Sequence, residues 1–166
     1  VLRFRKSLAE RFPDAPNYQR HLAAEHYKLA WLLQRHGDPE AARQECKAAV
    51  DVYKSLLEHF PEDPSHHHEL ARSHTGLGVL LMELDERDAT RDEFTTSLTI
   101  RKSLAGRFPD FPNDPEGFKD VYQRLFGLLL EAQDLEGARK LLRDAVSNAS
   151  QFRFAWPESK LADFYI

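Results

Sequence analysis

The chain has 166 residues, of which 42% are hydrophobic and 30% are charged, and its formal net charge at neutral pH is −4. This balance is typical of a folded helical protein, and it excludes the clustered positive charge that phosphate backbones require, so we expect no nucleic acid partner. The longest purely apolar runs, such as Val79–Met82, fall far short of the ~20 residues that cross a bilayer, and we expect no membrane segment.

Cys46 is the only cysteine, which excludes a disulfide within the chain. A lone cysteine fits an intracellular, reducing location, so we expect a cytoplasmic protein. The chain opens at Val1 without a start methionine, and residues 1–11 already have the pattern of a helix end. We therefore interpret the sequence as a piece of a longer protein, in which targeting signals cannot be read.

One sequence element occurs three times at a constant spacing. It is the dipeptide Phe-Pro, followed three residues later by a second proline, and the leucines between its copies keep the same register. A fixed period of this length, about 48 residues, is typical of an α-solenoid, in which copies of one helical unit stack on each other. The three dipeptides are Phe12-Pro13, Phe60-Pro61 and Phe108-Pro109.

A partial helix is expected over residues 1–12, and the first complete unit follows it. Apolar residues recur at helical spacing over 17–36, which predicts an amphipathic helix. A second helix then runs to Phe60, because Pro61 disfavours helical geometry in the residue before it. The first unit thus spans about 17–60.

Three consecutive residues specify the turn inside the first unit. Gly37 supplies a left-handed stop, Asp38 caps the second helix, and Pro39 occupies its first turn, where a missing N–H costs nothing. The sequence therefore predicts a short, well-defined helix–turn–helix.

The two later units repeat this plan with local changes. In the second unit, about 65–108, Ser65 is the expected cap of the first helix, and the inner turn is polar and lacks a glycine. The third unit, about 114–152, begins with Asp114 and Pro115 as a cap and first-turn pair.

Residues 153–166 break the repeat, and two interpretations remain open for them. They form either a C-terminal cap that covers the apolar end of the array or a truncated tail. Residues 1–152 are expected to form the array itself. The predicted fold is all-α, a solenoid of three extended helix hairpins with a partial N-terminal helix and a C-terminal cap.

At these spacings the units resemble the tetratricopeptide repeat, although its usual period is shorter, about 34 residues. The resemblance covers about residues 17–152 and implies a right-handed solenoid. It rests on a large residue, a leucine, a small residue and a hydrophobe on the first helix, a Gly-Asp turn, and small residues on the second helix. In the first unit these are His26, Leu29, Ala30, Leu33, Gly37, Asp38, Ala42, Cys46 and Ala49.

The lengthened repeat resembles one subgroup more closely. A Phe-Pro linker followed by Leu22-Ala23 and His26, or by Leu70-Ala71 and His74, is similar to the tetratricopeptide tails of bacterial serine/threonine protein kinases and, less closely, to kinesin light chains. No kinase motif occurs in these residues, so any kinase domain would lie outside them. The resemblance implies a protein–protein interaction scaffold, a regulatory or recruitment segment of a larger protein.

In such arrays the concave groove is lined by outward positions of the first helices. Trp31, beside Lys28 and Arg35, has the composition of an interface anchor, although a tryptophan can equally be core. We expect a protein or peptide to bind there; the alternative is a self-associating segment without a groove ligand. The resemblance assigns to the groove Tyr27, Lys28, Trp31, Arg35, Arg72, Thr75, Val79, Met82, Gln123 and Arg124.

The histidines and acids do not form an evident catalytic or metal-binding set. The consecutive residues His66–His68 point about 100° apart on a helix, so they cannot share one ion. His26 and His74 occupy the same slot of successive units, which indicates a structural role. Since no nucleophile–base or phosphate-binding motif is found, we expect neither an enzyme nor a cofactor.

Overall fold

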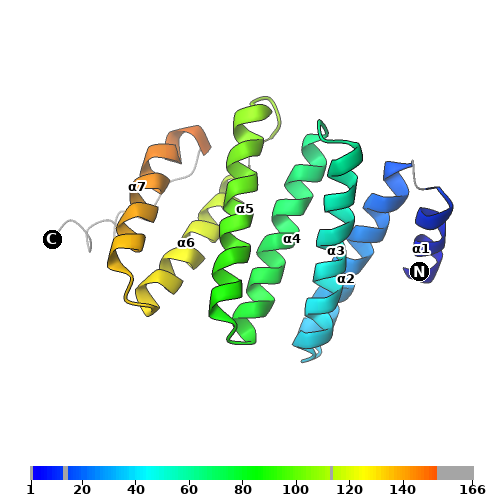
Figure 1. Ribbon diagram of the computed structural model, residues 1–166, viewed down its shortest axis with the longest axis horizontal. Helices are drawn as coiled ribbons and strands as arrows, with labels where there is room; N and C mark the ends of the chain where they lie inside the picture. The colour runs from blue at the N-terminus through cyan, green and yellow to red at the C-terminus, as the bar shows by residue number, and fades with distance from the viewer. Residues whose placement is uncertain (1, 13–14, 113, 153–166) are drawn as a thin grey trace. The chain divides into compact units, whose positions relative to one another are not determined.

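The computed structural model describes residues 2–12, 15–112 and 114–152, and over these residues the fold is all-α, as predicted (Figure 1). None of the described helices combines the length and the hydropathy needed to cross a membrane. The helices, in chain order, are α1 (Leu2–Arg11), α2 (Pro16–Arg35), α3 (Pro39–His59), α4 (Pro64–Glu83), α5 (Arg87–Arg107), α6 (Pro115–Glu131) and α7 (Leu135–Phe152).

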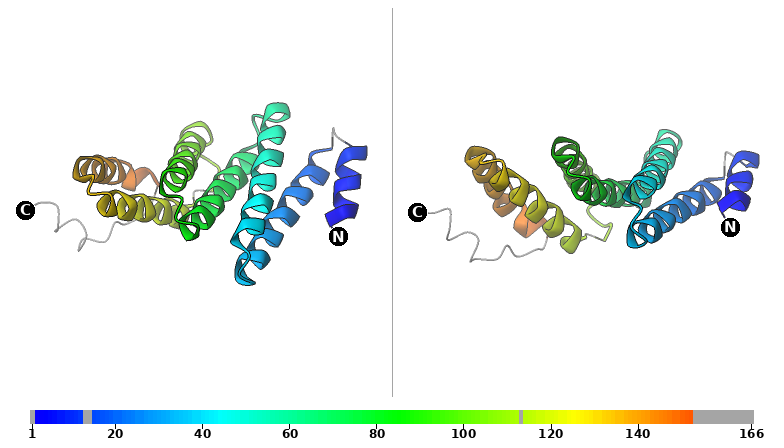
Figure 2. Two further views of the ribbon diagram at one scale, coloured as in Figure 1. Left: turned by 60° about the horizontal axis from the view of Figure 1, so that its bottom comes forward. Right: turned by 90° about the horizontal axis from the view of Figure 1, so that it is seen from below.

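The chain divides into two compact units, the first ending at Ile100 and the second beginning at Arg101, so that α5 contributes to both. In the first unit α1 packs on α2, α2 on α3 and α3 on α4, as helices of a solenoid do (Figures 1 and 2). In the second unit α6 packs on α7. Successive helices therefore bury their apolar faces against the next helix along the chain.

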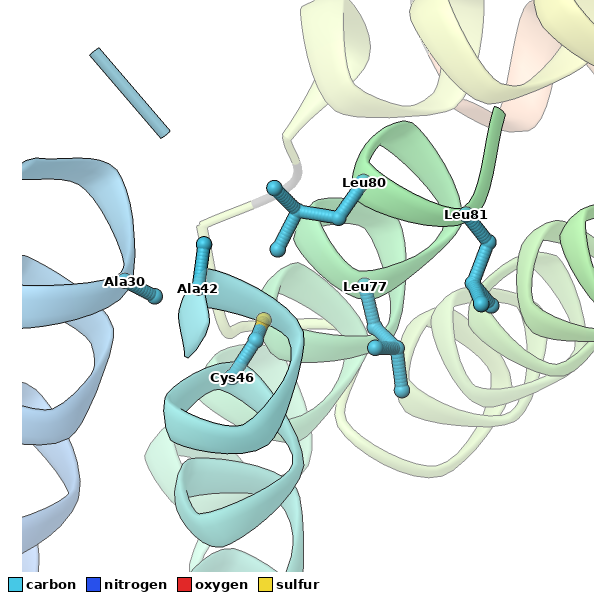
Figure 3. Close-up of a cluster of buried hydrophobic side chains, with 6 residues drawn as sticks. All are labelled: Ala30, Ala42, Cys46, Leu77, Leu80 and Leu81. Carbon is cyan, nitrogen blue, oxygen red and sulfur yellow. The ribbon is translucent and has the colours of Figure 1, made fainter. Parts of the chain in front are cut away.

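Small side chains at the helix contacts allow the helices of the first unit to approach closely. Figure 3 shows Ala30 of α2 pointing toward Ala42 of α3, in one buried cluster with Cys46 of α3 and Leu77 of α4. A second cluster joins α2, α3 and α4 further along and includes Ile100 of α5. Its buried members are Ala23, Val50, Tyr53, Leu56 and Leu70.

The turn inside each hairpin has the same backbone geometry, although only the first contains a glycine. Gly37 has a φ of 80°, and the equivalent residues one and two repeats later, Asp85 and Gln133, have φ values of 59° and 58°. The predicted left-handed stop at Gly37 is thus confirmed. Asp tolerates this conformation through local hydrogen bonds, whereas Gln adopts it at a steric cost.

Aspartates cap the helices that follow the turns and linkers. The side chain of Asp38 accepts a hydrogen bond from the Ala41 N–H (3.0 Å), and Asp114 accepts one from the Gly117 N–H (3.0 Å), as predicted. The predicted cap at Ser65 is wrong: Asp63 accepts a hydrogen bond from the Ser65 N–H (2.8 Å). The helix begins earlier than expected because Pro64 suits its first turn.

One polar contact ties the two helices of each hairpin together. Nδ1 of His26 lies 2.6 Å from the Glu45 carboxylate, and one repeat later Nδ1 of His74 lies 2.5 Å from that of Glu93. In the third hairpin the Tyr122 hydroxyl donates to the Asp144 carboxylate (2.6 Å). These ties fix how each pair of helices is rotated against each other.

In the second unit, polar contacts join the end of α5 to α6 and α7. Arg101 is 3% exposed and donates to the Asp114 carboxylate (2.6 Å), while Lys102 donates to Asp144. Burial opposes ionisation of Asp144, but the hydrogen bonds from Lys102 and Tyr122 hold its pKa below the ordinary value. Asp144 therefore stays ionised at neutral pH.

Two glycines in open surroundings differ only in backbone conformation, and we predict opposite effects of alanine at them. Gly37→Ala is expected to lower the free energy of unfolding by about 1 kcal/mol, because alanine is strained at positive φ. Gly127→Ala, inside α6, is expected to raise it by ~0.5–1 kcal/mol. Urea unfolding followed by circular dichroism measures both, and effects of the same sign would contradict the assigned turn.

The His74–Glu93 contact gives a second prediction. Glu93→Ala leaves the buried His74 without its partner at Nδ1, so we expect a loss of about 1–3 kcal/mol in unfolding free energy. Asp92→Ala, on the exposed neighbour, is the control and is expected to change stability by less than ~0.5 kcal/mol. Equal losses of unfolding free energy for the Glu93 and Asp92 variants, measured by urea unfolding at pH 7, would show that the His74–Glu93 contact makes no specific contribution to stability.

Candidate functional site

A groove of about 530 Å³ lies in the first unit between α2 and α4, over the side chain of Tyr53 from α3. We call it the α2–α4 groove. Tyr53 is buried and forms its floor, whereas the residues of α2 and α4 form its two walls. The lining residues are Ala24, Tyr27, Lys28, Trp31 and Leu32 of α2, Tyr53 of α3, and Glu69, Arg72 and Ser73 of α4.

Tyr53 places a protonated phenol under the groove. Burial, followed by the nearby Glu69 carboxylate, raises the pKa of Tyr53 to about 12, since both disfavour the phenolate. The hydroxyl therefore remains a hydrogen-bond donor at any physiological pH.

Tyr27 reaches from α2 across to α4 because residue 76 has no side chain. A Cβ atom built on Gly76 would lie 2.8 Å from Cε2 and 3.1 Å from the hydroxyl oxygen of Tyr27. The guanidinium of Arg72 lies 5.8 Å from the centroid of the same ring, a cation–π contact. Gly76 and Arg72 thus hold Tyr27 in place as one boundary of the groove.

Trp31 is 51% exposed, which does not fit the alternative interpretation as a core residue. The guanidinium of Arg35 lies 4.7 Å from its ring centroid, so one face of the indole is covered by a cation. Leu32, next to Trp31, is also exposed. This end of α2 therefore presents apolar surface that the fold itself does not bury.

Two cations of the groove also form weak surface ion pairs. Nζ of Lys28 lies 3.3 Å from the Glu25 carboxylate, and Arg72 lies 3.2 Å from both oxygens of Glu69. Both are exposed contacts three residues apart on one helix, which contribute only about 0–1 kcal/mol. A ligand carboxylate can replace such partners at little cost.

Four of the ten predicted site residues line the α2–α4 groove: Tyr27, Lys28, Trp31 and Arg72. Arg35 adjoins them through its contact with Trp31. The remaining members of the predicted set lie elsewhere, and the structure uses some of them for packing.

The hydroxyl of Thr75 donates to the Ala71 carbonyl (3.1 Å) and contacts the Ser97 hydroxyl (2.8 Å), so it serves the packing of α4 on α5. Val79 is partly buried and Met82 is 41% exposed; neither lines the groove. Gln123 and Arg124 lie on α6 in the second unit, where Arg124 donates to both carboxylate oxygens of Asp120 (2.9 Å each).

Sequence reasoning missed Tyr53, Glu69 and Gly76. Tyr53 follows the apolar pattern of α3 and is indistinguishable from core in the sequence. Gly76 is a mid-helix glycine, but Gly127 is one too and has nothing near it, so the sequence does not reveal which of them makes room for another side chain.

The described histidine and cysteine side chains do not gather into a metal-binding group. Among residues 2–12, 15–112 and 114–152, no group of three or more His, Cys, Asp or Glu side chains is arranged to hold a metal ion. The Cys46 thiol is buried and lies 3.5 Å from the Ser73 carbonyl oxygen. Burial, with a smaller contribution from Glu93, raises the pKa of Cys46 to about 12, so the thiolate is not formed at neutral pH.

Comparison with known proteins supports the repeat type. A family model described as tetratricopeptide repeat matches residues 27–68, from the middle of α2 into α4. A comparison with curated proteins finds no match. Among solved structures, the crystal structure of BtubC (BKLC) from P. vanneervenii is similar, with a TM-score of 0.64 and 16% sequence identity over 94% of this chain and 58% of that chain.

At this level of identity the likeness concerns the fold alone. The chain spans less than two thirds of the length of the protein that it resembles. The matched segment 27–68 contains Tyr27, Trp31 and Tyr53 of the α2–α4 groove, whereas the groove residues of α4 lie just beyond it.

Trp31 and Tyr53 line the same groove but differ in burial, which gives a prediction. Trp31→Ala is expected to change the free energy of unfolding by less than ~1 kcal/mol and to leave helicity nearly unchanged, because much of the indole is already exposed. Tyr53→Ala removes a buried aromatic side chain and is expected to cost about 3–5 kcal/mol. Urea unfolding followed by circular dichroism compares them; similar losses would show that Trp31 is part of the core.

Proposed function

We propose that this chain binds a protein or peptide in the α2–α4 groove and serves as a recruitment segment of a larger protein. Tetratricopeptide repeats generally mediate protein–protein interaction, and the family match includes Tyr27, Trp31 and Tyr53 of this groove. The observation that carries the proposal is the half-exposed Trp31, which lies under Arg35 at a groove that the fold leaves open.

The residues of the groove favour a particular kind of ligand. An apolar ligand side chain would enter over Tyr53 between Tyr27 and Trp31, where burying an aromatic or aliphatic group contributes most of the binding energy. Lys28, Arg35 and Arg72 place three cations around this position, and the one carboxylate among the lining residues, that of Glu69, is paired with Arg72. We therefore propose a ligand segment with a large apolar residue flanked by Asp or Glu.

The proposal includes the cellular compartment in which the chain acts. Cys46 is free and buried, which suits a reducing compartment, and we therefore propose that the segment acts in the cytoplasm.

A peptide-display selection against the 166-residue chain tests this proposal. Selected peptides are expected to lose affinity for Trp31→Ala and Arg72→Ala by about tenfold or more, the loss expected for an interface anchor. Arg91→Ala is the matched control, because Arg91 is an exposed arginine on α5 outside the groove, and it should bind like the parent chain.

Two outcomes would contradict the proposal. Peptides that bind the Trp31 and Arg72 variants as tightly as the parent chain would place their site elsewhere. Sedimentation that reveals a stable dimer, with Trp31 protected from fluorescence quenchers in the dimer, would favour self-association in place of a groove ligand.

A further inference from the structure

At the junction between α3 and α4, the ring of Phe60 packs against the ring of His66 from the first turn of α4. This pair has a counterpart one unit earlier. The ring centroids of Phe12 and Tyr18 lie 5.4 Å apart, and those of the equivalent residues in the next unit, Phe60 and His66, lie 6.2 Å apart. In both places the second ring belongs to the third residue of the following helix. His66 thus fills a slot that the first unit gives to an uncharged aromatic residue.

The imidazole of His66 is enclosed without being hydrogen-bonded. Only 1% of the residue is exposed, and neither ring nitrogen has a hydrogen-bond partner among the residues that the structure describes. A carboxylate oxygen of Asp63 lies 3.6 Å from Nε2, which is beyond the range of a strong hydrogen bond. An imidazolium in this slot would therefore have two N–H donors, and only the Asp63 carboxylate and the Phe60 backbone carbonyl lie near them, neither in the geometry of a strong hydrogen bond.

The charged groups around His66 do not compensate for its burial. Loss of hydration is the largest effect, and it lowers the pKa of His66 below the ordinary value of 6.5. Asp63 and the Phe60 backbone oppose this shift, whereas the positive charge of Arg20 on α2 and the neighbouring His67 add to it. The seated ring is therefore neutral at pH 7.

Solvent reaches the edge of the slot. A hollow of about 550 Å³ lies along the linker and is lined by His66 and Phe60. The nearest solvent-accessible space for a displaced His66 ring is therefore this hollow. The other titratable residues that line the hollow are His59, Glu62 and Asp63.

We propose that His66 makes the junction between α3 and α4 sensitive to mild acid: the neutral ring seats against Phe60, and the protonated ring leaves its slot and loosens the junction. An imidazolium gains well-formed hydrogen bonds by moving out into water, since within the slot Asp63 and the Phe60 carbonyl offer it only weak contacts. Both helices belong to the first unit, so the effect falls on the stability of that unit.

The sign of the pH dependence follows from proton binding. Because the seated ring holds its proton more weakly than a free histidine, the open state binds more protons below pH ~6.5. The contribution of His66 to stability is thus complete above this pH and is lost as the pH falls toward the pKa of the seated ring. In this window the ratio of open to closed molecules rises by up to about tenfold for each pH unit.

Urea unfolding of the 166-residue chain between pH 7.5 and 5.0 tests the proposal. His66→Tyr introduces the residue of the equivalent slot, and its unfolding equilibrium is expected to rise less steeply with acid than that of the parent chain, by up to about tenfold per pH unit. His21→Gln, which removes an exposed histidine of α2, is the control and should follow the parent chain. Parallel profiles for His66→Tyr and the parent chain would overturn the proposal.

An NMR titration of the His66 ring protons in the unmodified chain tests the proposed protonation of His66 without any variant. A midpoint below pH 6.5, with the Phe60 ring signals shifting at the same pH, is expected. A midpoint at or above pH 6.5 would overturn the proposal even if His66→Tyr failed to fold.

Discussion

The first unit depends on the burial of α3, the second helix of its hairpin, against α2 on one side and α4 on the other. In the first unit α3 meets α2 through Ala42 and Cys46 and meets α4 through Leu77 and Leu81, so neither hairpin completes its core alone. Burial of apolar surface is the main force that stabilises folded chains, and here it acts between neighbours in the sequence. The polar ties and the left-handed turns then select one rotation and one spacing for each helix pair.

Much of the fold could be predicted from the sequence because its determinants are local. The turn at Gly37, the cap at Asp38 and the cap pair at Asp114 each need only two or three residues to specify them. The cap of α4 was misplaced to Ser65 because both Asp63 and Ser65 can cap, and only the position of Pro64 in the folded helix decides between them.

The candidate site was less predictable, because a groove is a property of two helices and of what lies beneath them. Tyr27, Lys28 and Trp31 could be assigned from their outward positions on one helix, but Tyr53 joins the groove only through the packing of α3 below it. Thr75 shows the converse: its helical position suggested an outward side chain, and a hydrogen bond to Ser97 directs its hydroxyl toward α5.

The ties inside the hairpins have a consequence for how such an array can change. His74 contacts the carboxylate of Glu93 on α5. The equivalent of Glu93 one repeat later, on α7, is Leu141, and the partner of Tyr122 is instead Asp144, one helical turn further along α7. Replacing α5 with the sequence of α7 would therefore leave the buried imidazole of His74 and the carboxylate equivalent to Asp144 without their hydrogen-bond partners. The third hairpin is therefore not interchangeable with the first two, and a recombination that involves it must carry both of its helices together.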